Sequence, residues 1–243
     1  MNPFFFGDSG KQLFGVYHPA GKRSARGAVI CYPWAREYLL AHPTVRLLAQ
    51  RLAENGCHSL RFDYLGTGDS AGDATVGSER QWVEDIRSAV AELRDVAQVR
   101  EIALIGMRFG ATLAAVAAAV LPDISSLVLW DPVIEGGKYL AELGVAASSN
   151  GLPIDVQGGV LTSQLRQDLL AISPAAFAAR LPRTLVVSTG GDEPSRLEPQ
   201  LRSAGVDYTI EQVPDVQVWR EEWGRGGKGL AASAVNRIVT WLD

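Results

Sequence analysis

A short apolar run that ends in two closely spaced glycines constrains the fold of this chain more than any other feature of its sequence. Residues 102–105 read Ile-Ala-Leu-Ile, Gly106 and Gly110 follow with Arg108 midway between them, and an alanine-rich stretch begins at once. This order predicts a buried strand, a sharp turn and a helix. Side chains two positions either side of the central residue would collide with the sheet, and glycine removes them. Arg108 is therefore predicted to have a strained backbone conformation.

The spacing is that of a nucleophile elbow, the turn that presents an attacking serine or cysteine above a sheet. Arg108 stands where that nucleophile belongs. A guanidinium stays protonated at neutral pH and has no nucleophilic oxygen or sulfur, so the residue excludes an acyl-serine route at this position. A cation at the positive end of a helix requires a nearby anion. Arg108 is therefore predicted either to hold a carboxylate or phosphate of a small ligand, or to form an internal ion pair with Asp192 or Asp131.

Composition and charge limit the class of protein. At 243 residues, 47% hydrophobic and 21% charged, the chain fits one globular domain, and its net charge of −4 with scattered basic residues predicts no nucleic-acid partner. No run is long enough to span a membrane, and residues 1–7 lack the pattern of a secretion signal. Two cysteines, Cys31 and Cys57, give no sign of an oxidising compartment, so we expect a cytoplasmic protein. Neither a phosphate-binding loop nor a metal-ligand pattern is present, so no cofactor is expected.

Buried-strand patterns alternate with amphipathic or alanine-rich segments, which predicts an α/β fold with a mostly parallel, doubly wound sheet. Strands are expected at 13–17, 27–32, 58–62, 102–105, 126–129, 184–188 and 207–212. Helices are expected at 43–55, 79–95, 110–120, 194–204 and 229–242. More than fifty residues separate the strands at 126–129 and 184–188, far more than a simple crossover needs. We therefore expect a single domain over 1–243 with a cap inserted at 135–180.

A second motif carries a family resemblance. Residues 63–72 read Asp-Tyr-Leu-Gly-Thr-Gly-Asp-Ser-Ala-Gly and resemble the D-x-x-G-x-G-x-S-x-G loop of the α/β-hydrolases. With the elbow, they make the chain similar to the serine-aminopeptidase-like branch of that superfamily, and Arg108 together with residues 129–133 resembles the hydrolase-like proteins of bacterial exosortase systems. The resemblance implies an α/β-hydrolase fold, an acid at Asp192 and a histidine after the last strand. Residues 213–220 contain no histidine, and His18, His42 and His58 all precede the elbow.

The resemblance also indicates which residues surround the site. It puts an oxyanion loop at residues 32–35, where Pro33 has no N–H, so Trp34 or Ala35 would donate from this side and Phe109 from the elbow. Asp131 directly follows a strand, at the sheet edge where open α/β folds bind ligands. The remaining candidates are a histidine beside the loop and aromatic residues that would line a pocket: His42, Tyr32 and Trp130.

Three functions remain open from the sequence. The leading one is a binding protein, or a non-hydrolytic enzyme, that holds an acyl, carboxylate or other anionic small molecule at Arg108. The second is a true hydrolase or acyl transferase that uses a non-standard residue such as Cys31 or His42. The third is a non-catalytic partner of a biosynthetic or secretion enzyme, in which Arg108 is an internal plug. A homodimer or a pathway-protein partner is left open.

Overall fold

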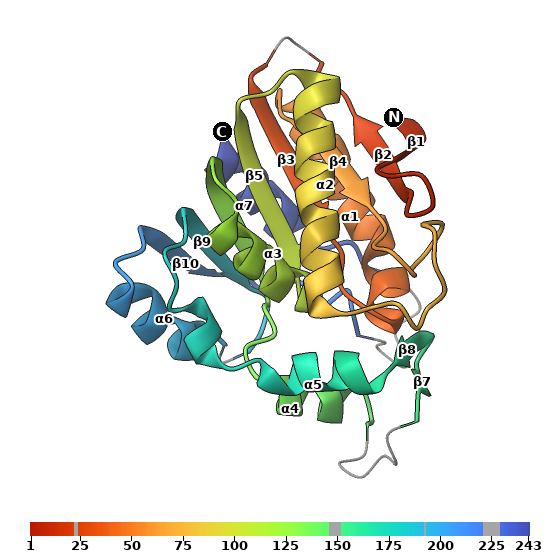
Figure 1. Cartoon of the computed structure of the whole chain (residues 1–243). Helices are drawn as coiled ribbons and strands as arrows, with labels where there is room; N and C mark the ends of the chain where they lie inside the picture. Colours follow the sequence, from red (N-terminus) through yellow and green to blue (C-terminus); the bar gives the residue numbers. More distant parts are fainter. Residues whose placement is uncertain (22–23, 146–151, 192, 221–228) are drawn as a thin grey trace.

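An eight-stranded sheet forms the centre of the computed structural model, which describes residues 1–21, 24–145, 152–191, 193–220 and 229–243 (Figure 1). The strand order is β1-β2-β4-β3-β5-β6-β9-β10. The six strands from β4 to β10 run parallel, and the first two pair antiparallel at one edge. Their bounds are β1 Asn2–Phe6, β2 Leu13–His18, β3 Arg26–Cys31, β4 His58–Phe62, β5 Glu101–Met107, β6 Ile124–Trp130, β9 Arg183–Ser188 and β10 Tyr208–Gln212.

Helices cover both faces of the sheet (Figure 1). The helix α2 (Glu79–Ala97) packs against α3 (Phe109–Val120) on one face, and α1 (Arg36–Glu54) packs against α7 (Ala232–Leu242) on the other, while α6 (Glu193–Ser203) lies beside β9 and β10. Parallel sheets need such cover because both faces are apolar. In the described part of the chain, none of the helices combines the length and apolar character needed to cross a membrane.

The long connection between β6 and β9 forms elements of its own beyond one end of the sheet, at the bottom of Figure 1. They are α4 (Gly136–Glu142), the hairpin strands β7 (Ile154–Val156) and β8 (Gly159–Leu161), α5 (Ser163–Ala171) and the 3-10 helix η1 (Pro174–Phe177). The helices α4 and α5 touch closely at Gly136, where a Cβ would lie 1.5 Å from the carbonyl oxygen of Leu169. We propose that residues 135–180 act as the cap.

The expected elements differ from the observed ones at a few places. All seven expected strands are confirmed, each boundary within two residues. The strand β1 was missed, as were the elements between β6 and β9. The start of the first helix at Pro43 was wrong: α1 begins at Arg36 and contains Pro43, so His42 lies inside the helix and not at its entrance. A proline inside a helix removes one hydrogen bond and crowds the carbonyl four residues before it, and the buried face of α1 outweighs that cost.

The strand register brings four loops together at the carboxyl edge of the sheet. Cys31 pairs with Gly106, and Trp130 pairs with both Met107 and Val187. The segments that follow β3, β5, β6 and β9 therefore start side by side. Open α/β sheets bind ligands at this edge.

Candidate functional site at the Arg108 turn

The turn between β5 and α3 has the sharp geometry that the two glycines predicted. Arg108 has φ 54° and ψ −123°, a strained conformation for a side chain with a Cβ, which costs about 1–3 kcal/mol. A Cβ on Gly106 would lie 2.3 Å from the carbonyl oxygen of Gly110, and a Cβ on Gly110 would lie 2.3 Å from that of Tyr32. Neither position accepts a side chain without moving backbone, so the glycines hold Arg108 in this turn.

The guanidinium of Arg108 is buried and bonded to two carboxylates. Its Nε donates to Glu37 Oε1 at 3.0 Å, and its Nη2 donates to Glu142 Oε2 at 2.6 Å. Its Nη1 lies 3.5 Å from the backbone oxygen of Asp131. The Tyr139 hydroxyl donates to the second oxygen of Glu37 at 2.9 Å. We call Arg108, Glu37, Glu142 and Tyr139 the Arg108 cluster.

The two carboxylates of the cluster are anchored differently. Glu37 lies in the first turn of α1 with both oxygens bonded and its side chain 8% exposed. Glu142 is the last residue of α4, has one bond to Arg108 and is 30% exposed along its side chain. Sequence reasoning missed both as partners of Arg108. Glu37 follows the expected oxyanion loop by two residues, which is a usable signal, whereas nothing in the sequence marks Glu142.

Burial and charge act in opposite directions on this cluster. Burial raises the pKa of Glu37, and the opposing effects of Arg108 and of the Tyr139 hydroxyl only partly offset it. Burial acts against the charge of Arg108, yet the carboxylates of Glu37 and Glu142 outweigh it and raise its pKa above the usual value. Arg108 is therefore a permanent cation. With both carboxylates ionised, the cluster carries one negative charge more than positive.

The loop after β10 supplies an indole where the family resemblance implies a histidine. The ring of Trp219 lies 5.3 Å from the Arg108 guanidinium carbon, and the ring of Tyr139 lies 5.5 Å from it. Both distances fit cation–π contacts. Trp219 is 4% exposed, and its Nε1 has no hydrogen-bond partner among the residues that the structure describes. An indole nitrogen cannot accept a proton as a general base does.

Asp131 lies next to Arg108 but directs its carboxylate elsewhere. It accepts hydrogen bonds from the Ser188 hydroxyl at 3.2 Å and from the Thr189 hydroxyl at 2.8 Å and backbone N–H at 3.1 Å. Burial raises the pKa of Asp131, partly opposed by these bonds from Thr189. Its carboxylate therefore ties the end of β6 to the end of β9. Asp192, the other expected acid, lies outside the described residues.

The surroundings of the two expected non-standard catalytic groups shift their pKa values in opposite directions. Burial raises the pKa of the Cys31 thiol to about 12, so it is protonated at neutral pH. The Nε2 of His42 lies 3.3 Å from an Arg61 nitrogen, and its ring stacks on Tyr32 with 6.0 Å between the ring centres. Burial and then the charge of Arg61 lower the pKa of His42.

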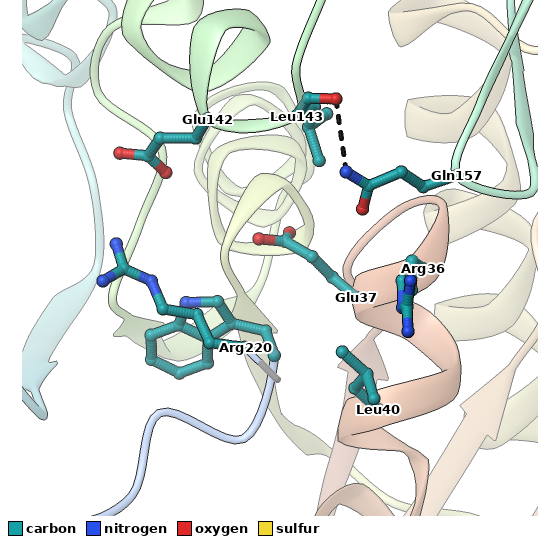
Figure 2. Close-up of a pocket in the computed structure, with 8 residues that line it drawn as sticks. Arg36, Glu37, Leu40, Glu142, Leu143, Gln157 and Arg220 are labelled. Carbon is teal, nitrogen blue, oxygen red and sulfur yellow. Dashed lines mark hydrogen bonds between the residues drawn. The ribbon is translucent and has the colours of Figure 1, made fainter. Parts of the chain in front are cut away.

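A cleft of about 560 Å³ opens beside the cluster (Figure 2). Figure 2 shows Arg36 and Glu37 reaching it from α1, and Glu142 and Arg220 facing them from the other side. Trp219 contributes a further wall. Arg108 itself does not line this cleft, because Glu37, Glu142 and Trp219 lie around its guanidinium.

A second cavity of about 330 Å³ lies under the hairpin β7–β8, and three expected ligand-binding residues line it: Tyr32, Trp34 and Ala35. The other two are packed into the core. Phe109 is 1% exposed and contacts the ring of Tyr139, and Trp130 is fully buried in β6. Gln157 borders both cavities. Within the described ranges, no group of three or more histidine, cysteine, aspartate or glutamate side chains could hold a metal ion.

Comparisons with a protein-family model and with solved structures both match this chain to hydrolases. The family described as "Serine aminopeptidase, S33" matches residues 43–166. No curated protein sequence matches the chain. Among solved structures, the chain is similar to Est1E from Butyrivibrio proteoclasticus with ferulic acid bound (TM-score 0.73, 15% identity, covering 98% of this chain and 96% of that one). It is also similar to DcsB in complex with its substrate analogue (TM-score 0.70, 14% identity, covering 99% of this chain and 97% of that one). A third similar structure is the thioesterase domain from the curacin biosynthetic pathway (TM-score 0.63, 16% identity, covering 100% of this chain and 99% of that one).

Proposed function

The chain belongs to the serine aminopeptidase S33 family and has the α/β-hydrolase fold, and from that premise we propose that it binds an acyl or carboxylate small molecule at Arg108 without acyl-serine hydrolysis. One observation carries the proposal. At the place of the family's nucleophile, Arg108 already holds a carboxylate, that of Glu142, by a charge-assisted bond of 2.6 Å. A ligand carboxylate has the same chemistry as the group that is bound there.

The ligand reaches Arg108 by replacing Glu142. Both carboxylates border the cleft, but Glu37 has two bonds and a side chain that is 8% exposed, so it stays. Glu142 has one bond, and its side chain is 30% exposed. Exchange of one carboxylate for another leaves the charge of the cluster unchanged, so it avoids the penalty of adding a charge to a buried site. The displaced Glu142 turns toward solvent, where it needs no partner.

The cleft suits such a ligand. Its volume of about 560 Å³ lies within the range of small-molecule sites. Arg36 and Arg220 border it together with Trp219, so two cationic side chains and an indole surround the path to the cluster. Arginine binds planar carboxylates well because its N–H groups match their geometry.

The same residues argue against the family's usual reaction. The triad of a serine hydrolase needs a hydroxyl or thiol and a base within hydrogen-bond reach. The family resemblance implies those two groups at Arg108 and in the loop that holds Trp219, which supports the loss of both, and burial keeps the Cys31 thiol protonated at neutral pH. Losing triad members typically lowers the chemical step by about 10⁶-fold.

The setting of this activity is part of the proposal. We place the chain in the cytoplasm and, from the resemblance at Arg108 and residues 129–133, among the exosortase-associated hydrolase-like proteins. The closed Arg108 cluster also favours a second candidate function, in which the chain is a non-catalytic partner of a biosynthetic enzyme and Arg108 only stabilises the fold. Absence of carboxylate binding in the titration described next would favour this second function.

Isothermal titration calorimetry with ferulate and its neutral methyl ester tests the proposal. Wild type is expected to bind ferulate and not the ester. Glu142→Gln removes the internal competitor and is expected to tighten ferulate binding up to about tenfold. Arg108→Lys keeps the positive charge but loses the planar fork, so it is expected to weaken binding.

The matched control is Glu135→Gln. Glu135 lies at the start of the same cap helix and lines a small pocket beside Arg108, but it pairs with Arg196. The variant therefore removes a neighbouring carboxylate that does not bond to Arg108, and it is expected to bind ferulate as wild type does. Equal binding of the methyl ester, or ferulate binding that Glu142→Gln leaves unchanged, would contradict the proposal.

A further inference from the structure

Aromatic side chains and one carboxylate line the second cavity. Of the residues that line its volume of about 330 Å³, five are aromatic and one is a carboxylate. The aromatic residues are Tyr32, Trp34, Tyr38, Tyr64 and Trp82. Two pairs of rings lie close together, Tyr32 with Tyr38 at 4.8 Å between centres and Tyr64 with Trp82 at 5.3 Å. The carboxylate is that of Asp63.

Asp63 is buried without a cation beside it. Its side chain accepts a hydrogen bond from the Tyr38 hydroxyl at 2.8 Å and one from the backbone N–H of Asp69 at 3.0 Å, and the residue is 6% exposed. No ion pair of Asp63 is present in the described part of the chain. Burial raises the pKa of Asp63, and the two hydrogen bonds and the charge of Arg61 only partly oppose that rise. The Arg61 guanidinium is itself bonded to the Tyr32 hydroxyl. Buried carboxylates are normally paired with a cation.

Residues 157–160 of the cap hairpin form one wall of the cavity. Gly159 in β8 lies on the indole of Trp34, and a Cβ there would approach the ring to 2.8 Å. The absent side chain lets the hairpin backbone lie flat on the ring. Gly68 also lines the cavity, and a Cβ there would lie 2.1 Å from Asp63 Oδ2. The space that remains is compact and has one charged group on its wall.

We propose that this cavity binds a compact organic ammonium group, held by the aromatic rings and by the carboxylate of Asp63. An ammonium over aromatic faces gains about 0.5–2 kcal/mol from the ring electrons. The carboxylate adds a direct attraction that is strong because both charges are away from water. An anion would be repelled by Asp63, and a neutral ligand would leave its charge unpaired. The site is separate from Arg108 and does not depend on the proposed function.

Titration of the whole chain with choline, and with its neutral isostere 3,3-dimethyl-1-butanol, tests the proposal. The two molecules have nearly the same shape and differ in the positive charge. Tryptophan fluorescence or calorimetry is expected to show choline binding about tenfold or more tighter than the alcohol. Equal affinity for choline and the alcohol would overturn the proposal. So would the absence of choline binding at about 10 mM, a concentration at which a site of even millimolar affinity is largely filled. Neither result requires a variant protein.

Two variants at one hydrogen bond separate recognition from folding. Asp63→Asn removes the charge and is expected to weaken choline binding about tenfold, with the alcohol unaffected. Tyr38→Phe removes the same hydrogen bond but keeps the ring and the carboxylate, so it is expected to weaken choline binding less than Asp63→Asn does. A loss of choline binding in Tyr38→Phe as large as that in Asp63→Asn, or no loss in a folded Asp63→Asn, contradicts the proposal. Glu142→Gln is expected to leave choline binding unchanged, which keeps this test distinct from that of Arg108.

Discussion

Replacing Arg108 with methionine removes the cation from a buried cluster that holds two carboxylates. Glu37, whose side chain is 8% exposed, would keep the Tyr139 hydroxyl as its donor in the cluster. Breaking a buried ion pair by removing one partner destabilises a protein by about 3–5 kcal/mol. Glu142 is 30% exposed along its side chain and can turn to solvent. We therefore expect Arg108→Met to lower the free energy of unfolding at pH 7 by about 3–5 kcal/mol, almost all of it through Glu37.

Urea denaturation at pH 7 and pH 5 measures this loss. Burial already raises the pKa of Glu37, against the effect of Arg108. Without the guanidinium, the folded-state pKa rises further above the unfolded value of about 4.3. A carboxyl group with a raised folded-state pKa destabilises the fold as it ionises, so the loss is full near pH 7 and shrinks as the pH falls toward the unfolded value. A loss below about 1 kcal/mol, or one that is equal at both pH values, would refute this reasoning.

Two control variants identify the cause. Glu37→Gln added to Arg108→Met removes the uncompensated charge and keeps an acceptor for Tyr139, so it is expected to recover most of the lost stability. Arg51→Met removes an arginine from the exposed pair with Glu54 on α1, where a change of at most about 1 kcal/mol is expected. An equal loss in Arg51→Met would show that the urea assay reports the lost arginine and not the buried cluster.

Three other predictions concern the elbow and its surroundings. Arg108→Ser is expected to give no efficient hydrolysis of p-nitrophenyl acetate, because Trp219 provides no base, and a robust turnover would contradict that assignment. Gly110→Ala puts a Cβ 2.3 Å from the Tyr32 oxygen and is expected to lower the unfolding free energy by about 1–3 kcal/mol or more. Gly137→Ala, with open space in α4, should not destabilise. Iodoacetamide is expected to modify Cys31 only after unfolding, since the thiol is fully buried, and rapid native labelling would disagree.

The sequence predicted the parts of the fold that depend on local patterns. The seven expected strands are apolar, β-branched runs, and parallel strands buried on both faces read in that way. The edge strand β1 was missed because its phenylalanines pair antiparallel with β2 and three of its five residues stay exposed. The start of α1 was misplaced because Pro43 was taken as a first helical position, where proline is common.

The site was predicted at its centre and not at its periphery. The glycines around Arg108 fix a strained turn through local sterics, so position 108 could be identified from spacing alone. Its carboxylate partners come from residues 71 and 34 positions away along the chain, and no local pattern encodes such contacts. Asp131, an expected partner, bonds instead to Ser188 and Thr189, because the register of β6 and β9 brings those groups closer.

Intact-mass spectrometry after treatment with a fluorophosphonate tests most directly the claim that position 108 holds charge and does not attack an acyl carbon. The reagent adds covalently to activated serine nucleophiles. Arg108 is bonded to Glu37 and Glu142, and Trp219 lies in the segment where the family resemblance implies a histidine. We therefore expect no mass increase in wild-type protein under conditions that fully label an active serine hydrolase. A stoichiometric adduct on any residue around the elbow would contradict the account.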